Sequence, residues 1–252
     1  MKKLICIIRA MIAIAIIAIN ILTIPVIVIL LALITKIMPI KSLKKILYKL
    51  SHNILPDLWV AINSFAMDVA STTEWEIIQN GELSREGWYF LMSNHQSWLD
   101  ILVLQRVFLR KIPMLKFFMK QDLLWTLPIG GLACYVLDFP FMKRHNKEFL
   151  KKHPEQRDKD IETTRKSCEK YKYQPIAVMN YVEGTRFTEE KHRIRKSPYQ
   201  NLLPPKAGGI ALVLATMSDY MQHIIDTTIV YHTKTPSLAD FFFGKIKKIT
   251  VV

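Results

Sequence analysis

The longest feature of the hydrophobic pattern is an apolar run near the amino terminus. From Ala10 to Thr35 the chain has 26 consecutive uncharged residues, most of them Ile, Leu, Val or Ala. A helix of that length extends roughly 39 Å, which exceeds the hydrocarbon core of about 30 Å. Residues 1–36 are therefore predicted to be a membrane anchor that crosses as one tilted helix. Pro25, near the middle, also permits a hairpin embedded in one leaflet.

The flanks of this run favour a retained anchor over a cleaved signal peptide. A signal peptide has an apolar core of about 7 to 15 residues and a small-residue cleavage site, whereas this run ends in Lys36 and a lysine-rich segment. Basic residues precede the run as well, but the larger group follows it. The positive-inside rule then places residues 36 onward on the cytoplasmic side of the inner membrane.

Residues 37–70 are predicted to form a basic interfacial helical region. Four lysines alternate with apolar residues at helical spacing: Lys41, Lys44, Lys45 and Lys49 with Leu43, Ile46, Leu47 and Leu50. Such a helix can lie on an anionic bilayer surface, and a solvated linker is the alternative. Of the net charge of +14, residues 1–50 supply eight bases and no acids, which leaves 27 − 21 = +6 for the remainder. No nucleic-acid motif accompanies this charge, so nucleic acid is not expected as a partner.

The remaining chain alternates between two periodicities. Runs of strand length are rich in β-branched and aromatic residues, and helical patterns lie between them. The predicted strands are 88–92, 176–182, 227–231 and 249–252, and the predicted helices are 97–110, 155–171 and 205–217, the last with Pro205 in its first turn. This order predicts an α/β domain over 71–252, with a mixed or mainly parallel sheet flanked by helices. Because the chain ends inside a strand-like run, we expect a natural C-terminal segment beyond it.

Several common kinds of site lack their motifs in this sequence. Three widely spaced cysteines, Cys6, Cys134 and Cys168, indicate neither a disulfide framework nor a zinc site. A nucleophile elbow, a phosphate-binding Gly-x4-Gly-Lys loop and a His-Glu-x-x-His pair are all absent from the sequence. We therefore expect no metal and no resident cofactor.

A histidine followed five positions later by an aspartate occurs three times, so the spacing alone has little value. His52 and Asp57 are separated by Pro56, which disfavours a shared helical turn. His153 is followed by Pro154 and stands among charged residues, as at a solvated helix start. Both of these pairs are interpreted as structural or surface features.

The third pair, His95 and Asp100, has a different context. The histidine follows the strand-like run 88–92, and Ser97 with Asp100 has the Ser-x-x-acid form of a helix N-terminal cap. An aspartate in the first helical turn could accept a hydrogen bond from one imidazole N–H and fix the tautomer. An ordinary capping box beside a surface histidine is the alternative interpretation.

A second polar cluster lies at the end of another strand-like run, at Asn180-Tyr181-Val182-Glu183-Gly184-Thr185-Arg186-Phe187. Arginine offers a planar fork to phosphate oxygens, and glycine lets the backbone approach a ligand closely. Taken alone, the cluster could be a polar turn. Together with Asn-His-Gln-Ser-Trp-Leu-Asp (residues 94–100), it resembles the glycerolipid acyltransferases of the lysophosphatidic acid acyltransferase family.

The resemblance covers roughly residues 85–235 and implies specific roles. In that family the histidine is the general base on the acceptor hydroxyl and the aspartate orients it, which points to His95 and Asp100 as catalytic residues. The residues implied to bind the acceptor phosphate or to belong to the family's other blocks are Arg144, Glu183, Gly184, Thr185, Arg186 and Lys206. The block that ends in Arg144 has Asp138 where the family usually has glycine. The fourth block, at 227–231, lacks the family's proline, so the resemblance does not predict the shape of the far wall of the site.

The function implied by the resemblance is O-acyl transfer at a membrane. The acyl donor would be a thioester, either acyl-CoA or an acyl carrier protein, and the acceptor a lysophospholipid, foremost 1-acyl-glycerol 3-phosphate. A thioester is already activated, so a base and oxyanion donors suffice without a covalent nucleophile or a metal. Another lyso-lipid, glycerol 3-phosphate or a lipid A precursor remain as alternative acceptors. A non-catalytic membrane adaptor is the alternative from another class.

Overall fold

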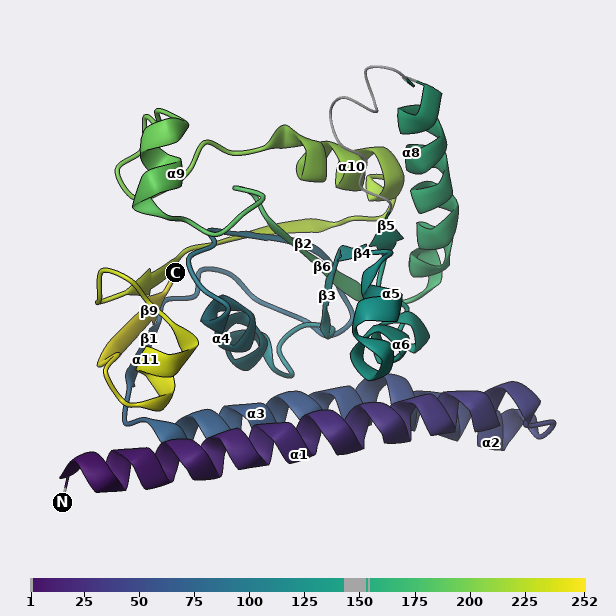
Figure 1. Cartoon of the computed structure of the whole chain (residues 1–252). Coiled ribbons are helices and arrows are strands. Elements are labelled where there is room, and N and C mark those ends of the chain that lie inside the picture. Colours follow the sequence, from purple (N-terminus) through teal and green to yellow (C-terminus); the bar gives the residue numbers. More distant parts are fainter. Residues whose placement is uncertain (1, 143–152, 154) are drawn as a thin grey trace.

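A helical base supports the rest of the molecule in the computed structural model, which describes residues 2–142, 153 and 155–252 (Figure 1). The base consists of α1 (Lys2–Ile37), α2 (Lys41–Lys49), a π-helical turn η1 (Leu50–Ile54) and α3 (Leu55–Ala70). Helix α1 continues through Pro25 without a break, so no hairpin forms at that residue. The chain reverses at 38–40 instead, and α3 returns along α1 (Figure 1).

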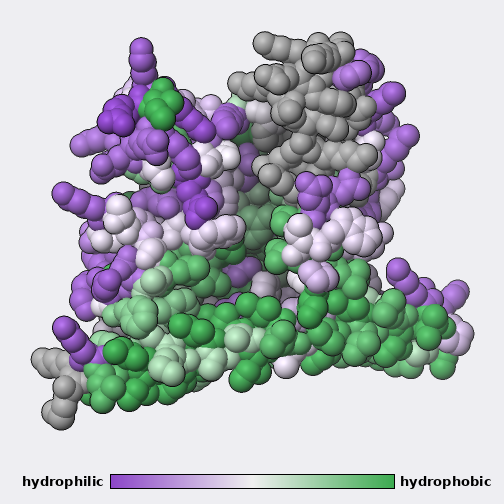
Figure 2. Space-filling model, viewed as in Figure 1, coloured by the Kyte–Doolittle hydropathy of each residue, from purple (hydrophilic) through white to green (hydrophobic). Residues whose placement is uncertain are grey.

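Helices α1 and α3 are joined by close packing and by a few polar contacts. The small side chains of Ala10 and Ala13 are fully buried on the inner face of α1. The Asn20 side-chain amide donates to Asn63 Oδ1 and to the Trp59 carbonyl oxygen, both at 2.9 Å. In contrast, the outer face of α1 is exposed and apolar, and the base forms a continuous hydrophobic band (Figure 2). Among the described helices, one segment, Lys3–Ile37, is long and apolar enough to cross a membrane.

The central sheet is four-stranded and entirely parallel, in the order β3-β6-β2-β7. Its strands are β3 (Leu115–Phe117), β6 (Ile176–Tyr181), β2 (Trp88–Ser93) and β7 (His223–Thr227). Helices cover both faces, which is why the interiors of β2 and β6 are almost wholly apolar and buried. In the register, Ser93 of β2 is paired with Tyr181 of β6 and Thr227 of β7. The three strands therefore end at one edge, which is called the carboxyl edge below.

A second sheet joins β1 (Glu74–Ile77), β9 (Lys248–Val251) and β8 (Ile229–Tyr231). Strands β1 and β9 are parallel and β8 is antiparallel to β9. The single strand predicted at 227–231 is wrong in this respect, because the chain changes sheets there. Thr228 bonds with Val252 through both backbone groups, between the end of β7 and the start of β8. A two-residue pair, β4 (Met119–Lys120) with β5 (Phe141–Met142), completes the described strands.

The helices of the α/β body include the three that the sequence predicts. Those are α4 (Leu99–Phe108), α8 (Glu155–Cys168) with a 3-10 turn η2 (Glu169–Tyr173), and α10 (Ala207–Met217). Pro205 precedes the N-cap Lys206 and lies outside the first turn of α10. The others are α5 (Leu123–Thr126), α6 (Pro128–Val136), α9 (Glu189–Ile194) and α11 (Leu238–Phe242). Helix α4 packs between the sheet and the base, whereas α8 and α10 cover the opposite side (Figure 1).

Candidate active site

His95 and Asp100 form a hydrogen-bonded pair at the carboxyl edge of the sheet. His95 follows the end of β2, and Asp100 lies in the first turn of α4. His95 Nδ1 is 2.8 Å from Asp100 Oδ2, and the two side chains are 14% and 1% exposed. The aspartate is thus sealed inside the protein while the imidazole still reaches the surface.

The same carboxylate also caps the helix. Asp100 Oδ2 accepts from the backbone N–H groups of Gln96 at 2.6 Å and Ser97 at 2.9 Å. Ser97 Oγ in turn accepts from Leu99 N at 3.2 Å. The sequence presented the cap and the histidine pair as alternatives, but the structure combines them in one carboxylate. The cap therefore fixes the acid to which the imidazole is bonded.

This geometry defines the proton arrangement on His95. A carboxylate can only accept, so Nδ1 carries the proton that joins the ring to Asp100. Nε2 is then the ring nitrogen whose lone pair can take a proton from a substrate. Tyr181, the last residue of β6, stacks on the ring with centroids 3.7 Å apart and an interplanar angle of 9°. The imidazole is therefore held in orientation by both its edge and its face.

Two tyrosines of this site escaped the sequence analysis. Tyr231 of β8 donates its hydroxyl to Asp100 Oδ1 at 2.7 Å. Tyr181 Oη is buried and has no partner among the described residues. Burial and the nearby Asp100 charge raise the pKa of both phenols, so both stay protonated. Tyr231 belongs to a recognised strand run, but only the folded chain brings it to Asp100.

We expect Tyr231→Phe to weaken catalysis without removing it. The substitution deletes one of the four hydrogen bonds to Asp100, and a bond to a charged group contributes about 1.5 to 3 kcal/mol. If half of this free energy is lost from the stabilisation of the transition state, kcat falls by about 3-fold to 10-fold. Steady-state kinetics should show the loss in kcat with an unchanged acceptor KM. A change confined to KM would contradict a role through Asp100.

Glu183 connects the loop after β6 to the histidine. Its Oε1 accepts from His95 N at 2.9 Å and its Oε2 from Leu203 N at 2.8 Å. Burial raises the pKa of Glu183, and these two N–H donors oppose that rise. Phe187 N also donates to the His95 carbonyl oxygen at 2.7 Å. The carboxylate of Glu183 is thus used inside the protein, and we infer that it positions the loop instead of contacting an anion.

The loop after β6 and the helix that follows it also carry positive charge. Arg186 is exposed and its guanidinium carbon lies 4.7 Å from the ring centre of Trp98. Lys191 Nζ donates to Thr185 Oγ1 at 3.0 Å, and Arg195 donates to the Glu183 carbonyl oxygen at 3.5 Å. These two bases of α9 and its C-cap escaped the sequence analysis, although they follow the motif directly. The loop has the charge and exposure needed to receive an anionic group.

Gly184 and Lys206 meet at the same place. Gly184 has φ of 67°, and a Cβ at this position would lie 2.9 Å from Lys206 Cδ. The lysine N–H also donates to the Val182 carbonyl oxygen at 2.7 Å. The positive φ therefore favours glycine here, and a side chain at this position would also have to displace the flexible lysine side chain. The structure brings Gly184, Thr185, Arg186 and Lys206 together beside His95, as the motif order implied.

Arg144, the remaining candidate, lies outside the described residues. The start of its block is described, and Asp138 there has φ of 61°. Left-handed backbone favours glycine, and aspartate is among the residues that tolerate it best. The backbone conformation at Asp138 is therefore one that glycine adopts freely.

The histidines of the other two motifs have partners of their own, and the side chain of Asp158 lies outside the described part of the structure. His52 bonds to Ser51 Oγ at 2.8 Å and to the Val136 carbonyl oxygen at 3.1 Å, while Asp57 pairs with Arg85 at 2.9 Å. His153 lies 3.5 Å from Glu155. Within the described part of the chain, no cluster of three or more His, Cys, Asp or Glu residues could hold a metal ion.

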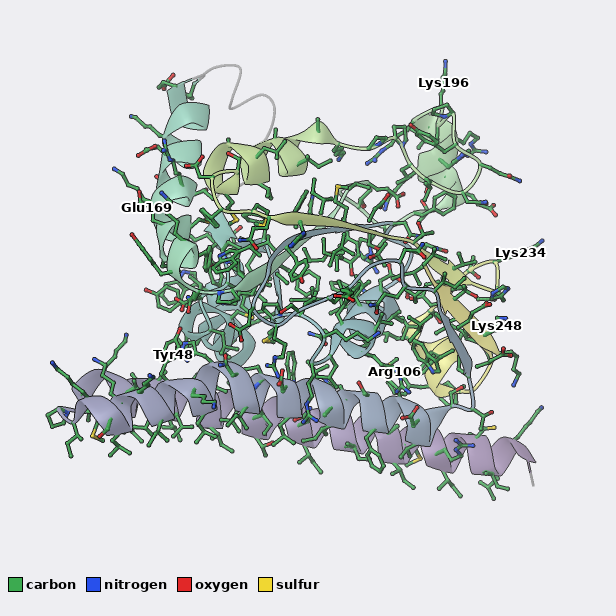
Figure 3. The ribbon with its side chains drawn as sticks, turned by 180° about the vertical axis from the view of Figure 1, so that it is seen from behind. Tyr48, Arg106, Glu169, Lys196, Lys234 and Lys248 are labelled. Atoms are coloured by element: carbon green, nitrogen blue, oxygen red, sulfur yellow. The ribbon has the colours of Figure 1, made fainter. Side chains whose placement is uncertain are left out.

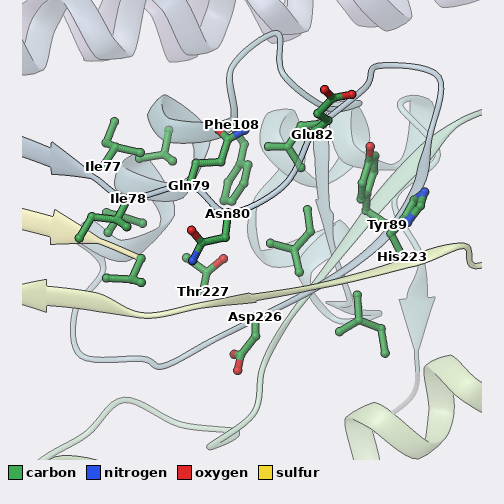
Figure 4. A pocket seen from close by; sticks show the side chains of 16 residues that line it. Ile77, Ile78, Gln79, Asn80, Glu82, Tyr89, Phe108, His223, Asp226 and Thr227 are labelled. Atoms are coloured by element: carbon green, nitrogen blue, oxygen red, sulfur yellow. The ribbon is translucent and has the colours of Figure 1, made fainter.

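A cavity of about 330 Å³ lies away from these residues, along the free edge of β7 (Figure 4). Residues 77–83 and the end of β9 form its opposite wall. His223 stacks against Tyr89 at this cavity, with ring centroids 5.3 Å apart. None of the candidate site residues lines it, so it is separate from the histidine site.

Comparison with known proteins agrees with the site geometry. Residues 76–232 match the family model described as "Acyltransferase", which spans more than half of the chain and includes both polar clusters. The chain belongs to this acyltransferase family.

The chain is also similar to individual curated proteins. The chain is 32% identical over 139 residues to the mouse "1-acyl-sn-glycerol-3-phosphate acyltransferase gamma", covering 52% of this chain and 34% of that one. It is 25% identical over 198 residues to the Arabidopsis thaliana "Probable 1-acyl-sn-glycerol-3-phosphate acyltransferase 5", covering 74% and 49%. The chain thus spans between a third and a half of the length of these curated relatives.

A solved structure shares the fold. The 1-acyl-sn-glycerophosphate (LPA) acyltransferase PlsC from Thermotoga maritima aligns with a TM-score of 0.53 and 13% identity. The alignment covers 100% of this chain and 84% of that one. At this identity the likeness supports the α/β fold with its helical base.

Proposed function

We propose that this protein transfers a fatty acyl chain from a thioester to the free hydroxyl of a lysophospholipid, foremost 1-acyl-glycerol 3-phosphate, giving phosphatidic acid. The observation that carries the proposal is the His95–Asp100 pair beside an exposed group of cations at one sheet edge. The names of the mouse, plant and Thermotoga maritima proteins support the choice of acceptor.

The reaction needs one base and two binding regions. His95 Nε2 takes the acceptor hydroxyl proton as the oxygen attacks the thioester carbonyl carbon. The tetrahedral intermediate then expels the thiolate, and the imidazolium returns the proton to the sulfur. Asp100 stabilises the positive imidazolium between these two steps. Acyl-CoA and an acyl carrier protein both fit this chemistry as donors, because each supplies the same thioester.

The cationic loop is proposed to bind the acceptor phosphate. Arg186 offers a planar fork, and Lys206 and Lys191 lie on neighbouring backbone. Negative phosphate held here would place the glycerol hydroxyl toward His95. Thr185, Gly184 and Glu183 shape this loop through the contacts given above. Arg144 is proposed for the same site from the resemblance alone.

We expect Arg186→Ala to raise the acceptor KM by about 10-fold or more while the donor KM stays unchanged. Losing a charge-assisted hydrogen bond to phosphate costs about 1.5 to 3 kcal/mol. Arg193→Ala is the matched control, because Arg193 is an exposed arginine on the nearby helix α9. Initial rates measured over a range of acceptor concentrations give the acceptor KM of both variants. Equal acceptor KM values for the two variants would argue against phosphate binding at Arg186.

We propose that the helical base, formed by α1, α2, η1 and α3, attaches the protein to the inner membrane, with the α/β body on the cytoplasmic side. Helix α1 has an exposed apolar face, and α2 adds the basic residues that anionic lipids attract. Exposed side chains of α5 and α6, including Trp125 and Tyr135, extend the apolar surface above the base. Above the helical base, the face shown in Figure 2 has a hollow in which hydrophobic residues are visible. Such a hollow suits an acceptor that arrives from the lipid bilayer.

A thioester-consumption assay separates this function from that of a membrane adaptor. Purified protein in lipid vesicles receives acyl-CoA, with or without lysophosphatidate, and the free thiol is measured. An acyltransferase releases CoA only when the acceptor is present, and an adaptor releases none. Repeating the assay with a panel of lyso-lipids then identifies the preferred acceptor.

A further inference from the structure

A second cavity lies at the amino ends of the central strands, opposite the carboxyl edge. Its volume is about 450 Å³, and it is called the amino-edge cavity here. Its walls come from the end of α2, from η1 and from the segments that lead into β2, β3 and β6: Tyr48, Lys49, His52, Asn53, Ile54, Asp57, Arg85, Glu86, Pro113, Met114, Lys116, Gln174 and Pro175. The length of β2, roughly 17 Å, separates it from His95.

Lys116 is the unusual residue of this cavity. It is on β3, and burial lowers the pKa of its ammonium group to about 8. Its ammonium nitrogen lies 5.4 Å from the ring centre of Tyr171. Within the described residues it makes no hydrogen bond or ion pair, although the negative charge of Asp138 opposes the effect of burial on its pKa. Because Asp138 is already paired with Lys170, a ligand that brings further negative charge would stabilise the half-buried ammonium group of Lys116.

Other hydrogen-bond donors line the same space. Tyr48 donates to Gln174 Oε1 at 2.8 Å, which leaves the amide nitrogen of Gln174 as a donor. Asn53 contributes a second amide, and Lys49 a second ammonium group. Asp57 and Arg85 neutralise each other through their ion pair, so the acid that remains in the lining is Glu86. Ammonium and amide donors around one space suit a group with several anionic oxygens.

The surroundings place this space beside the membrane-facing base. Tyr48 belongs to α2 of the helical base (Figure 3), and Ile54 of the cavity lining is 49% exposed. The π-helical turn η1 contributes three lining residues, His52, Asn53 and Ile54, and π-helical turns often mark functional sites. We propose that the amino-edge cavity is a second binding site, distinct from the catalytic one, for a phosphate-bearing group such as a lipid headgroup.

Amine labelling of Lys116 tests the proposal on the full-length protein. The protein is placed in vesicles of phosphatidylcholine alone, or with about one fifth phosphatidylglycerol, and a third sample adds inorganic phosphate to pure phosphatidylcholine. Mass spectrometry then compares the labelling of Lys116 with that of Lys234, an exposed lysine far from Tyr48 (Figure 3). We expect phosphatidylglycerol to slow Lys116 labelling by at least 5-fold and to leave Lys234 unchanged. Protection by inorganic phosphate alone would identify a free-anion site, and protection by neither would overturn the proposal.

A pair of variants keeps the proposal testable if Lys116 labels poorly. Lys116→Met removes the charge at similar length, and Lys45→Met removes a charge from the exposed face of α2. We expect Lys116→Met to have an unchanged or higher Tm without ligand and to lose the rise in Tm that phosphatidylglycerol gives. Lys45→Met should keep that rise. A full rise in Lys116→Met, or a lower ligand-free Tm, would show that the lysine is structural. Acyl transfer at His95 is assayed separately, so failure here leaves the catalytic proposal intact.

Discussion

His95→Ala is expected to lower kcat by about 10² to 10⁴-fold, with little change in either KM. That range is what a positioned general base contributes, because without it the acceptor hydroxyl must lose its proton to water during attack. The imidazole is partly exposed and its removal leaves Asp100 with three other donors, so the variant should fold. Single-turnover acyl transfer with saturating lysophosphatidate measures the loss.

Two other histidines serve as matched controls for this experiment. His52 is bonded to Ser51 and to the Val136 carbonyl oxygen, and His153 lies beside Glu155. Neither contacts the dyad, so His52→Ala and His153→Ala should keep most of the transfer activity. Equal losses at all three histidines would contradict the assignment of the base.

Asp100→Asn is expected to cost about as much activity as the loss of His95. An asparagine keeps the shape but not the charge, so it no longer stabilises the imidazolium, and its amide can present N–H to Nδ1. Nδ1 would then accept that hydrogen bond, and the proton would sit on Nε2, where it blocks the base. In the hydrolase triad the same change lowers kcat by about 10⁴-fold. The measurement is kcat of acyl transfer, together with Tm to follow the fold.

The effects of Asp100→Asn and Tyr231→Phe on stability should differ. Asp100 is fully buried and accepts two backbone N–H groups at the start of α4, so losing its charge should lower Tm by several degrees. Tyr231→Phe removes one of the four hydrogen bonds to Asp100 and keeps its charge, so it should lower Tm by less than Asp100→Asn does. Wild-type activity in Asp100→Asn would contradict the role of the carboxylate as the support of His95.

Much of this architecture follows from local sequence. The strands at β2 and β6 are long apolar runs, and their ends carry the polar motifs, so both the sheet and its reactive edge were predictable. The Ser97 to Asp100 cap was also visible. That the cap and the His95 pair share one carboxylate was not visible, since it depends on where the loop directs each oxygen.

The features that were missed arise from contacts distant in sequence. Tyr231 reaches Asp100 across 131 positions because the chain changes sheets at Thr228. Tyr181 stood in the strand run and the polar cluster without a role of its own, although its ring stacks on the imidazole. For α1, hydropathy predicted the helix but not its partner, since Asn20 and the small residues reveal an α3 contact only when both helices are seen. For Glu183, the motif indicated the acceptor phosphate, and only the folded chain shows that its carboxylate accepts from the backbone N–H groups of His95 and Leu203.

The most direct test of the central claim compares two acceptors that differ by a single hydroxyl. Wild-type protein and His95→Ala receive acyl-CoA with either lysophosphatidate or its analogue that lacks the free glycerol hydroxyl, and thiol release is followed. The account predicts rapid release for the wild type with lysophosphatidate and background release in the other three combinations. Equal release with the analogue, or undiminished release by His95→Ala, would contradict deprotonation of the acceptor hydroxyl by His95.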